Sequence, residues 1–244
     1  LERQVTLFQS KIVNQVIKEY DKEIDLIGFH GQTIFHNPDK KISKQLGDGK
    51  LLSQLTKKKV INNFREKDLD NGGQGAPLTP VFHKLISNII SQKYKVNFPI
   101  NIINIGGITN LTSIVNNFGG TQLDLFARDI GPGNCLIDEW IRKNSKNKFD
   151  LDGKIAKAGK LDNLILNQAI ENFNIQSYDK SLDVNDFDLS FVRGLNLEDG
   201  SAILTNFSAY LISNGIKYVT KVVKNSKGIF LVCGGGRKNI QLIK

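Results

Sequence analysis

The sequence predicts an α/β protein, and two patterns carry that prediction. Short apolar runs that end in glycine, such as 24–31 and 100–107, alternate with longer stretches in which apolar residues recur at helical spacing. Most of the glycine clusters also follow an apolar run directly, as expected where buried strands deliver loops to one edge of a sheet. At 244 residues and 40% hydrophobic content, the chain is long enough to bury a large core.

The first part of the chain should be a mixed region of its own. Its helices are predicted from apolar spacing, its strands from short apolar runs, and its hairpin from an interrupting Asn-Pro-Asp turn. The elements expected here are a helix over 5–19, a strand over 24–31, a hairpin turning at 37–39, a strand over 58–64 and a helix over 79–93.

A boundary is expected near 94–99, which divides the chain into domains of residues 1–95 and 96–244. The second domain should open with two strands around a glycine turn, followed by a third strand that ends in another glycine-rich bend. Helices are then expected from Asn134 onward, over 160–173 and over 199–219, before a closing strand, glycine turn and helix.

The composition argues against several classes of function. The net charge is +9, but 27 of the 33 basic residues are lysines scattered through the chain, so nucleic-acid binding is not favoured. No apolar run has the length of a membrane span, so no membrane partner is expected. Cys135 and Cys233 are interpreted as small buried hydrophobes in a reducing cytoplasm, and the three histidines show no zinc-ligand spacing, so no metal-ligating residues are assigned.

Four glycine clusters suggest close approach of the backbone to a ligand. Bare N–H groups at strand ends make concavities that bind anions, especially where a helix follows, although a single glycine bend is usually an ordinary hairpin. The spacing matches neither a Walker A loop nor the GxGxxG dinucleotide pattern. Together they favour nucleotide or phosphate binding. The clusters are 72–75, 106–107, 131–134 and 234–236.

Eight segments, in order from about residue 24 to the end, resemble the anhydro-N-acetylmuramic acid kinase family. They are HGQT (30–33), QLGD (45–48), FREKDLDNGGQGAPLTPVFH (64–83), NIGGITNLT (104–112), DIGPGN with the following D.W (129–140), FDLDGKIAKAGK (149–160), KSLDVNDFDL (180–189) and CGGGRKN (233–239).

This resemblance implies a two-lobed, actin-like ATPase fold with ribonuclease-H-like lobes, of which the first lobe is incomplete here. It implies conversion of 1,6-anhydro-N-acetylmuramic acid, ATP and water into N-acetylmuramic acid 6-phosphate and ADP, during peptidoglycan recycling. Mg²⁺ is expected with the ATP, a small sugar as the partner and a homodimer as one assembly. The family's first phosphate loop and last substrate-facing helix have no match in this chain, so the 244-residue chain is expected to be inactive.

In the first lobe, the resemblance and the chemistry together suggest the catalytic residues. The reaction needs a carboxylate to deprotonate water and a cation to counter the developing charge. Asp68 is predicted as the general base and Arg65 as its charge-compensating partner; the alternative is that Asp68 only shapes a loop. The residues expected to bind the sugar are His30, Gln32, Thr33, Gly73, Gln74 and Gly75.

In the second lobe, the resemblance implies the nucleotide site. The 104–110 segment is similar to the superfamily's second phosphate loop, and 234–236 to its adenosine motif. Asp129 is expected either to reach magnesium through water or to hold its loop. The residues expected to bind the nucleotide are Gly106, Gly107, Asn110, Asp129, Gly131, Gly133, Asn134, Gly234, Gly235 and Gly236.

Other readings of the sequence stay open. The family usually has aspartate where this chain has Asn63, which we interpret as a structural position; an inactive nucleotide-binding protein is therefore an alternative. Another actin-like sugar kinase or an acetate-type kinase is the nearest alternative among enzymes. His36, in the hairpin, and His83, on a helix facing Val81 and Leu85, are not expected to be catalytic.

Overall fold

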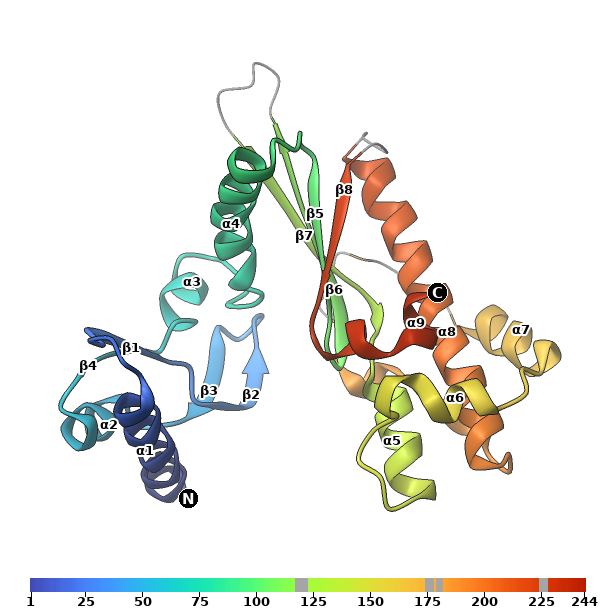
Figure 1. The fold of residues 1–244 in the computed structure, drawn as a ribbon, viewed down its shortest axis with the longest axis horizontal. Helices are drawn as coiled ribbons and strands as arrows, with labels where there is room; N and C mark the ends of the chain where they lie inside the picture. The colour runs from blue at the N-terminus through green and yellow to red at the C-terminus, as the bar shows by residue number, and fades with distance from the viewer. Residues whose placement is uncertain (117–122, 174–177, 179–181, 224–227) are drawn as a thin grey trace. The chain divides into compact units, whose positions relative to one another are not determined.

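The computed structural model describes residues 1–116, 123–173, 178, 182–223 and 228–244, and they confirm a mixed α/β protein (Figure 1). The chain divides into two compact units, unit 1 (Leu1–Leu78) and unit 2 (Thr79–Lys244). The predicted domain division at 95/96 stays a prediction. Among the described residues, no helix combines the length and the apolar character needed to cross a membrane.

Unit 1 combines helices with two small sheets. Strands β1 and β4 pair in parallel, and β2 and β3 form the predicted antiparallel hairpin. The helices α2 and α3 were not predicted; α2 begins after Asp48, whose side chain accepts a hydrogen bond from the Leu51 N–H, as an N-cap should. The bounds are α1 Glu2–Glu19, β1 Leu26–Phe29, β2 Gln32–Asn37, β3 Ile42–Leu46, α2 Gly49–Thr56, β4 Lys59–Asn62 and α3 Glu66–Asp70.

The core of unit 1 is small. Phe29, Leu52 and Leu69 are its buried apolar side chains, and one helix of this unit, α1, buries the hydroxyl residues Thr6 and Ser10. Thr6 Oγ1 accepts a hydrogen bond from the Asp48 N–H at 3.0 Å, which joins α1 to the start of α2. Polar contacts therefore hold much of this unit together.

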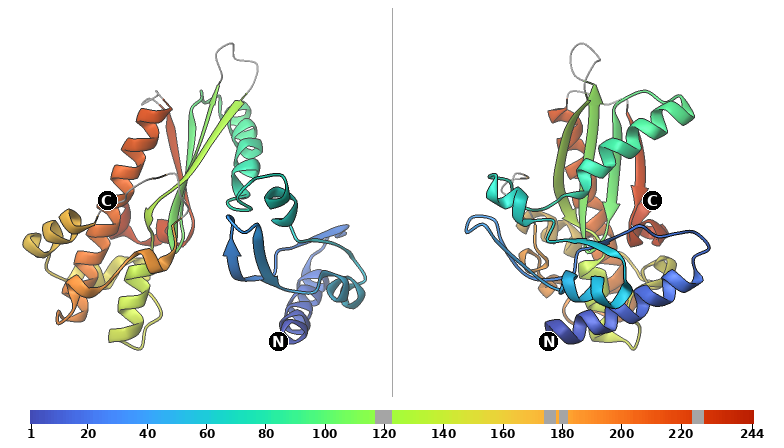
Figure 2. Two further views of the ribbon diagram at one scale, coloured as in Figure 1. Left: turned by 180° about the vertical axis from the view of Figure 1, so that it is seen from behind. Right: turned by 90° about the vertical axis from the view of Figure 1, so that its left-hand side faces the viewer.

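Unit 2 is built around a four-stranded sheet (Figure 2), and the predicted order of its strands and longer helices is confirmed. The short helix over Lys154–Ala158 was not predicted. The helices and strands are α4 Thr79–Tyr94, β5 Ile100–Ile105, β6 Ile108–Asn116, β7 Leu123–Pro132, α5 Cys135–Asn144, α6 Lys154–Ala158, α7 Asn163–Asn172, α8 Leu197–Val222, β8 Ile229–Cys233 and α9 Ile240–Ile243. Short 3₁₀ turns include η1 Leu151–Gly153 and η4 Gly235–Lys238.

The strand order of this sheet is β7-β6-β5-β8. Strand β6 is antiparallel to both of its neighbours, β5 and β7. Strand β8 follows the helices in the chain and lies parallel to β5. Three meandering strands followed by a crossover to the first strand is the topology of a ribonuclease-H-like lobe, as the resemblance implied.

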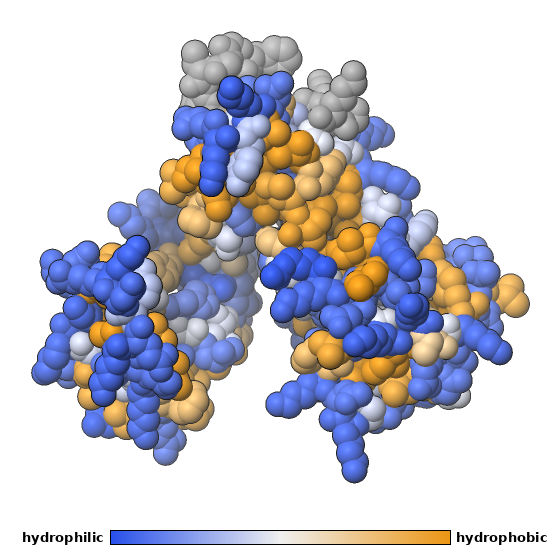
Figure 3. All heavy atoms as spheres, in the orientation of Figure 1, coloured by the Kyte–Doolittle hydropathy of each residue, from blue (hydrophilic) through white to orange (hydrophobic). Residues whose placement is uncertain are grey.

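The two faces of the sheet carry different helices. Ile100 and Ile102 on β5 pack in a cluster with Ile86 and Ile90 of α4, whereas Ile103 packs on the side of α8. Some apolar side chains around the sheet stay exposed (Figure 3), including Phe230 and Val232 on the edge strand β8 and Val81 and Leu85 on α4.

The expectation that His83 shares a face with Val81 and Leu85 is wrong. His83 is buried, and its Nδ1 lies 2.8 Å from Thr112 Oγ1 on β6, whereas Val81 and Leu85 are exposed. Positions two residues apart on a helix point about 200° apart, so the buried face of α4 takes the histidine and leaves the two aliphatic residues outside.

Candidate functional site

The carboxyl end of β5 is where unit 2 gathers its predicted glycine clusters. The 131–134 bend clasps the Gly106-Gly107 turn: Gly133 N–H donates to Gly107 O at 2.7 Å, and Asn134 N–H donates to Gly106 O at 2.8 Å. A Cβ on Gly133 would overlap Gly106 O, so only glycine allows this approach. We call these hydrogen bonds between 106–107 and 133–134 the clasp.

The third glycine cluster, 234–236, follows β8 and also lies at the carboxyl end of β5. Gly234 has φ +83°, and a Cβ there would overlap Ile105 O; a Cβ on Gly236 would overlap the Ile105 side chain. Arg237 turns back, and its Nη1 donates to Gly234 O at 2.8 Å. Three clusters that are up to 130 residues apart in the chain therefore surround the end of one strand, as strands β5 and β8 run in parallel.

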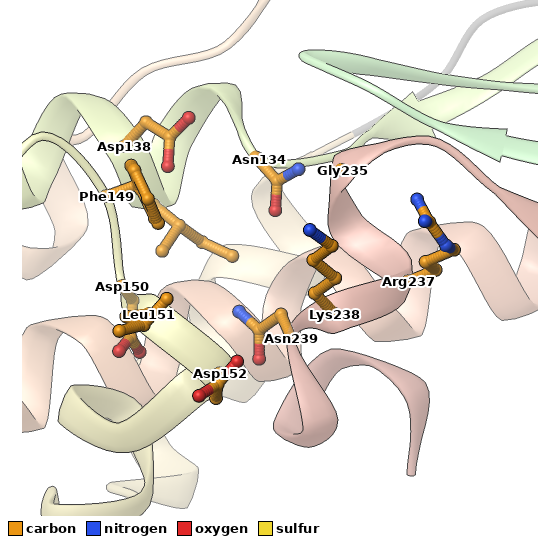
Figure 4. A pocket seen from close by; sticks show the side chains of 11 residues that line it. Asn134, Asp138, Phe149, Asp150, Leu151, Asp152, Gly235, Arg237, Lys238 and Asn239 are labelled. Carbon is orange, nitrogen blue, oxygen red and sulfur yellow. The ribbon is translucent and has the colours of Figure 1, made fainter.

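A cavity of about 400 Å³ adjoins this junction (Figure 4). The start of α5 forms one wall, the loop before η1 a second, and η4 with the residue after it a third. Phe149 and Leu151 offer apolar surface to it although both are more than half exposed, and the Lys238 side chain points towards Asn134. Most of the other lining residues are charged or carry amides, so the cavity suits a ligand with a flat apolar face and polar edges.

Two buried side chains fix the walls of this cavity. The Asp150 carboxylate accepts hydrogen bonds from the N–H groups of Ile155 and Ala156, at 2.8 and 2.9 Å. Asn239 is 4% exposed, and its Oδ1 caps the start of α9. Gly153, with φ +72°, lies so close that a Cβ would overlap this oxygen. The 149–153 loop and the 234–239 loop are thus packed against each other.

A row of polar residues crosses the sheet beside the clasp. Asn104 pairs with Asn110, and Asn110 pairs with Asp129, so the three side chains share one level of the sheet. Burial raises the pKa of the Asp129 carboxyl, and its hydrogen bond from the Leu182 N–H, at 2.9 Å, offsets part of that rise. This hydrogen bond ties Asp129 to the segment at Leu182, and both roles expected for Asp129 stay predictions.

Asp138 and Trp140, the two residues of the D.W pair on α5, have different surroundings. Trp140 is buried, and its Nε1 donates to Leu197 O at 3.0 Å. Asp138 instead lines the cavity, and Figure 4 shows its carboxylate near Phe149. Burial raises the pKa of Asp138, Arg142 lowers it and Asp150 raises it further.

The two cysteines are not activated thiols. Burial raises the pKa of Cys135 to about 11 and also raises that of Cys233, so both are thiols rather than thiolates at neutral pH. Cys135 is buried, and the Cys233 thiol contacts Asn104 Oδ1 at 3.6 Å. The interpretation as a small buried hydrophobe is confirmed for Cys135, whereas Cys233 is only partly buried.

In unit 1, the glycine loop 72–75 is wrapped around Asp68. The Gly75 N–H donates to Asp68 Oδ2 at 2.7 Å, and the Gly73 N–H donates to Asp68 O at 2.8 Å. A Cβ on Gly73 would overlap the carboxylate, and one on Gly75 would approach Leu69. The glycines therefore serve the contact with Asp68 and Leu69, which is the loop-shaping role weighed as the alternative. The role of Asp68 as a base stays a prediction.

Arg65 meets the HGQT segment. Its Nε donates to His30 Nε2 at 3.2 Å, so two predicted site residues are in contact. Thr33 Oγ1 accepts a hydrogen bond from Gln45 Nε2 at 3.4 Å, whereas the Gln32 side chain is exposed and contacts only the Thr33 carbonyl. A cavity of about 430 Å³ in this unit is lined in part by His30 and Gln45.

Asn63 is the position that we interpreted as structural. It adopts φ +57°, a conformation that asparagine tolerates better than most residues, and its Nδ2 donates to Glu66 Oε2. The side chain therefore ties the end of β4 to α3, in agreement with a structural role.

Several site residues were missed at the level of sequence. Phe149, Asp152, Lys238 and Asn239 line the cavity in unit 2, and the FDLDG segment that supplies two of them had been given no role. The signal was an asparagine directly before a helix, typical of an N-cap, together with an aspartate–glycine pair opening another helix. The contact between the 149–153 and 234–239 loops depends on tertiary packing, which no local sequence pattern indicates.

Comparison with known proteins defines the class and then the family. The structure shows an α/β protein whose second unit has ribonuclease-H-like topology and a glycine-lined site at the end of its sheet. The profile of one family, anhydro-N-acetylmuramic acid kinase, matches residues 1–244. The chain belongs to the anhydro-N-acetylmuramic acid kinase family.

Its relatives support the same assignment. The chain is 50% identical over 246 residues to the "Anhydro-N-acetylmuramic acid kinase" of Pelagibacter ubique, covering 100% of this chain and 64% of that protein. It is 36% identical to the protein of the same name from Zymomonas mobilis, again covering 64% of its length. The chain thus spans about 64% of these relatives.

Among solved structures, similarity is found to the activator of the 2-hydroxyisocaproyl-CoA dehydratase from Clostridium difficile with bound ADPNP. The TM-score is 0.33 at 14% sequence identity, over 59% of this chain and 48% of that one.

Proposed function

We propose that this chain forms the sugar-binding and nucleotide-binding parts of an anhydro-N-acetylmuramic acid kinase. The activity is the ATP-dependent conversion of 1,6-anhydro-N-acetylmuramic acid and water to N-acetylmuramic acid 6-phosphate, in peptidoglycan recycling. The observation that carries the proposal is the family match over residues 1–244, which the 50% identical relative reinforces.

The residues around the clasp fit ATP. The glycines at 234 and 236 leave the backbone bare where a side chain would otherwise stand, and the adjoining cavity of about 400 Å³ has apolar walls for a nucleobase. The N–H groups of Gly133 and Asn134 already bind carbonyl oxygens in the clasp. Within the described chain the Gly107 N–H has no such partner, which makes it the candidate phosphate donor in the turn.

Mg²⁺ belongs to the proposal as a companion of the ATP phosphates. Magnesium keeps several waters and commonly takes one or two carboxylates plus phosphate oxygens. In the described part of the chain no three acidic, histidine or cysteine side chains gather as a metal site. Asp129, beside the clasp, is the residue that would approach such an ion through water.

Two carboxylates compete for the role of general base. Asp68 is the residue predicted from the sequence, and its Oδ2 accepts the Gly75 N–H. Burial raises the pKa of the Asp129 carboxyl, which makes that carboxylate a better proton acceptor than an ordinary aspartate. The proposal keeps Asp68 as the base and adds Asp129 as the candidate that desolvation favours.

Release of ADP by the full-length protein, with and without 1,6-anhydro-N-acetylmuramic acid, tests the function. Release that depends on this sugar supports the proposal. Release with another acceptor only would indicate a different actin-like or acetate-type kinase, and tight nucleotide binding without release would indicate an inactive binding protein.

Asp68→Asn and Asp129→Asn separate the two bases. Loss of the general base should lower kcat by about 10²- to 10⁴-fold, because water is then no longer deprotonated. The variant of the carboxylate that is not the base should lose less of its kcat. If both variants retain activity, neither carboxylate is the base.

A cytoplasmic location and a homodimer complete the proposal. The two cysteines are free, as thiols are in a reducing compartment. Fractionation of cells that express the natural protein tests the first point, and sedimentation at two protein concentrations tests the second.

A further inference from the structure

Arg65 in unit 1 is oriented by a histidine whose protonation state its neighbours determine. His30 Nδ1 lies 2.9 Å from Gly31 O, and His30 Nε2 lies 3.2 Å from the Arg65 Nε–H. A carbonyl only accepts and an arginine only donates. His30 must therefore carry its proton on Nδ1 and accept through Nε2, which makes it a neutral imidazole.

A second histidine, His36, is affected by the charge of Arg65. Gln45 Nε2 donates to Ser43 Oγ at 2.7 Å, which leaves the Ser43 hydroxyl free to donate to His36 Nδ1, 3.0 Å away. Burial and the charge of Arg65 lower the pKa of His36, and the main chain of Gln74 offsets part of this. His36, which was not expected to be catalytic, is thus held in the hairpin by Ser43.

Within unit 1, Arg65 has no acidic partner. All residues of unit 1 are described, and none of its carboxylates lies within ion-pair distance of the guanidinium. The two acids nearest in sequence on α3 are held elsewhere, since Glu66 accepts from Asn63 and Asp68 accepts from the Gly75 N–H. Burial lowers the pKa of Arg65, yet arginine stays charged at neutral pH.

An uncompensated, partly buried cation is unfavourable unless an anion completes it. Nε is occupied by His30, so the end of the guanidinium that carries Nη1 and Nη2 is left for a ligand. This fork matches two oxygens of a carboxylate or of a phosphate, and the neutral imidazole of His30 orients the guanidinium without neutralising it. The geometry therefore suits an anion with two oxygens side by side, such as a carboxylate.

We propose that Arg65 binds the carboxylate of the lactyl ether of the sugar substrate, with His30 and His36 as positioning residues. The inference rests on the proposed function, because muramic acid differs from glucosamine in carrying this one carboxylate. It assigns Arg65 to substrate selection, whereas the sequence had assigned it to the charge that develops during catalysis.

Calorimetric titration of the full-length protein with two sugars tests the assignment. The sugars are 1,6-anhydro-N-acetylmuramic acid and 1,6-anhydro-N-acetylglucosamine, which lacks the lactyl group. Arg65→Gln should weaken binding of the first by about 10- to 100-fold, the range expected for hydrogen bonds to a charged group, and change binding of the second by less than about twofold. Arg3→Gln, an exposed arginine of the same unit, should change neither.

The result that overturns the proposal is an equal loss for both sugars, or no loss for either. A fall in kcat with the preference for the muramic sugar intact would also overturn it, since Arg65 would then act on the transferred phosphoryl group. If the wild-type protein binds neither sugar, the proposed function fails and this inference with it; if it binds both equally, only the inference fails.

The histidines are tested by the ratio of the two affinities. Glutamine at position 30 retains an acceptor for Arg65 Nε, so His30→Gln should keep most of the preference, whereas His30→Ala should reduce it severalfold. His36→Ala should also reduce it, and a parallel loss for both sugars in these variants would show a merely structural role.

Discussion

The glycine loops of the two units are held by different kinds of partner. In unit 2 the 131–134 bend is held by backbone groups, with Gly133 and Asn134 donating to the carbonyls of Gly106 and Gly107. In unit 1 the 72–75 loop is held by a side chain, the carboxylate of Asp68. A backbone partner cannot change rotamer, whereas a side chain can. The clasp should therefore be rigid, and the loop in unit 1 should tolerate change.

Gly133→Ala should have the largest effect. The added Cβ would overlap Gly106 O, which the sheet fixes, so the clasp must open and stability should fall by about 2–4 kcal/mol. Urea unfolding followed by circular dichroism measures this. Gly107→Ala is the matched control, because its Cβ would lie 3.9 Å from the nearest atom. Equal losses in the two variants would show that the clasp is not rigid.

Gly153→Ala should come next. It combines a left-handed φ, which costs a non-glycine residue about 1–2 kcal/mol, with displacement of the Asn239 oxygen that caps α9. Nucleotide affinity should fall together with stability, because both loops line the same cavity. Gly194→Ala has a similar φ of +89° but no atom near the added Cβ, so it measures the cost of the left-handed backbone conformation alone. Fluorescence titration with a labelled nucleotide separates the two variants.

Gly73→Ala should cost only about 1 kcal/mol. Its Cβ would overlap the Asp68 carboxylate, which can rotate away and release the loop. The thermal unfolding midpoint should change little while kcat changes more, if Asp68 is the base. A loss as large as that of Gly133→Ala would contradict the contrast between the two loops.

Asp129→Asn should have the smallest effect on stability and a distinctive pH dependence. A raised pKa means that the folded state holds the proton more tightly, so stability falls as pH rises from the ordinary aspartate value, about 3.9, through the folded-state value. The asparagine removes this decline while its oxygen can still accept the Leu182 N–H. Asp124→Asn, exposed on the same strand, should keep the decline in urea midpoints measured across that range.

Local patterns predicted most elements of the fold. Strands β5 to β8 and helices α5 and α8 follow from apolar periodicity and glycine punctuation, which act over a few residues. The helix α2 was missed because its first residue is one of two glycines that resemble a turn, although Asp48 gave the N-cap signal. The short α3 was missed because five charged and apolar residues show no period.

The glycine clusters of the candidate sites could be identified from the sequence, but the contacts of the charged side chains could not. Each glycine cluster could be identified alone, but the clasp needs Gly106 to meet Gly133 across a sheet register that no local pattern states. In the same way, the position of His36 beside Arg65 depends on how the hairpin packs against the start of α3. Whether an arginine is paired is decided by neighbours distant in sequence.

The two-residue turn at Gly106-Gly107 also limits which insertions the chain can tolerate between β5 and β6. Strands β5 and β6 leave this turn in a continuous ladder from Ile105–Thr109 to Ile100–Ile114. One inserted codon would shift β6 by a residue and exchange its inward and outward side chains, which would also misalign β7 behind it. Insertions should therefore be excluded from this turn even where the residues themselves could be substituted.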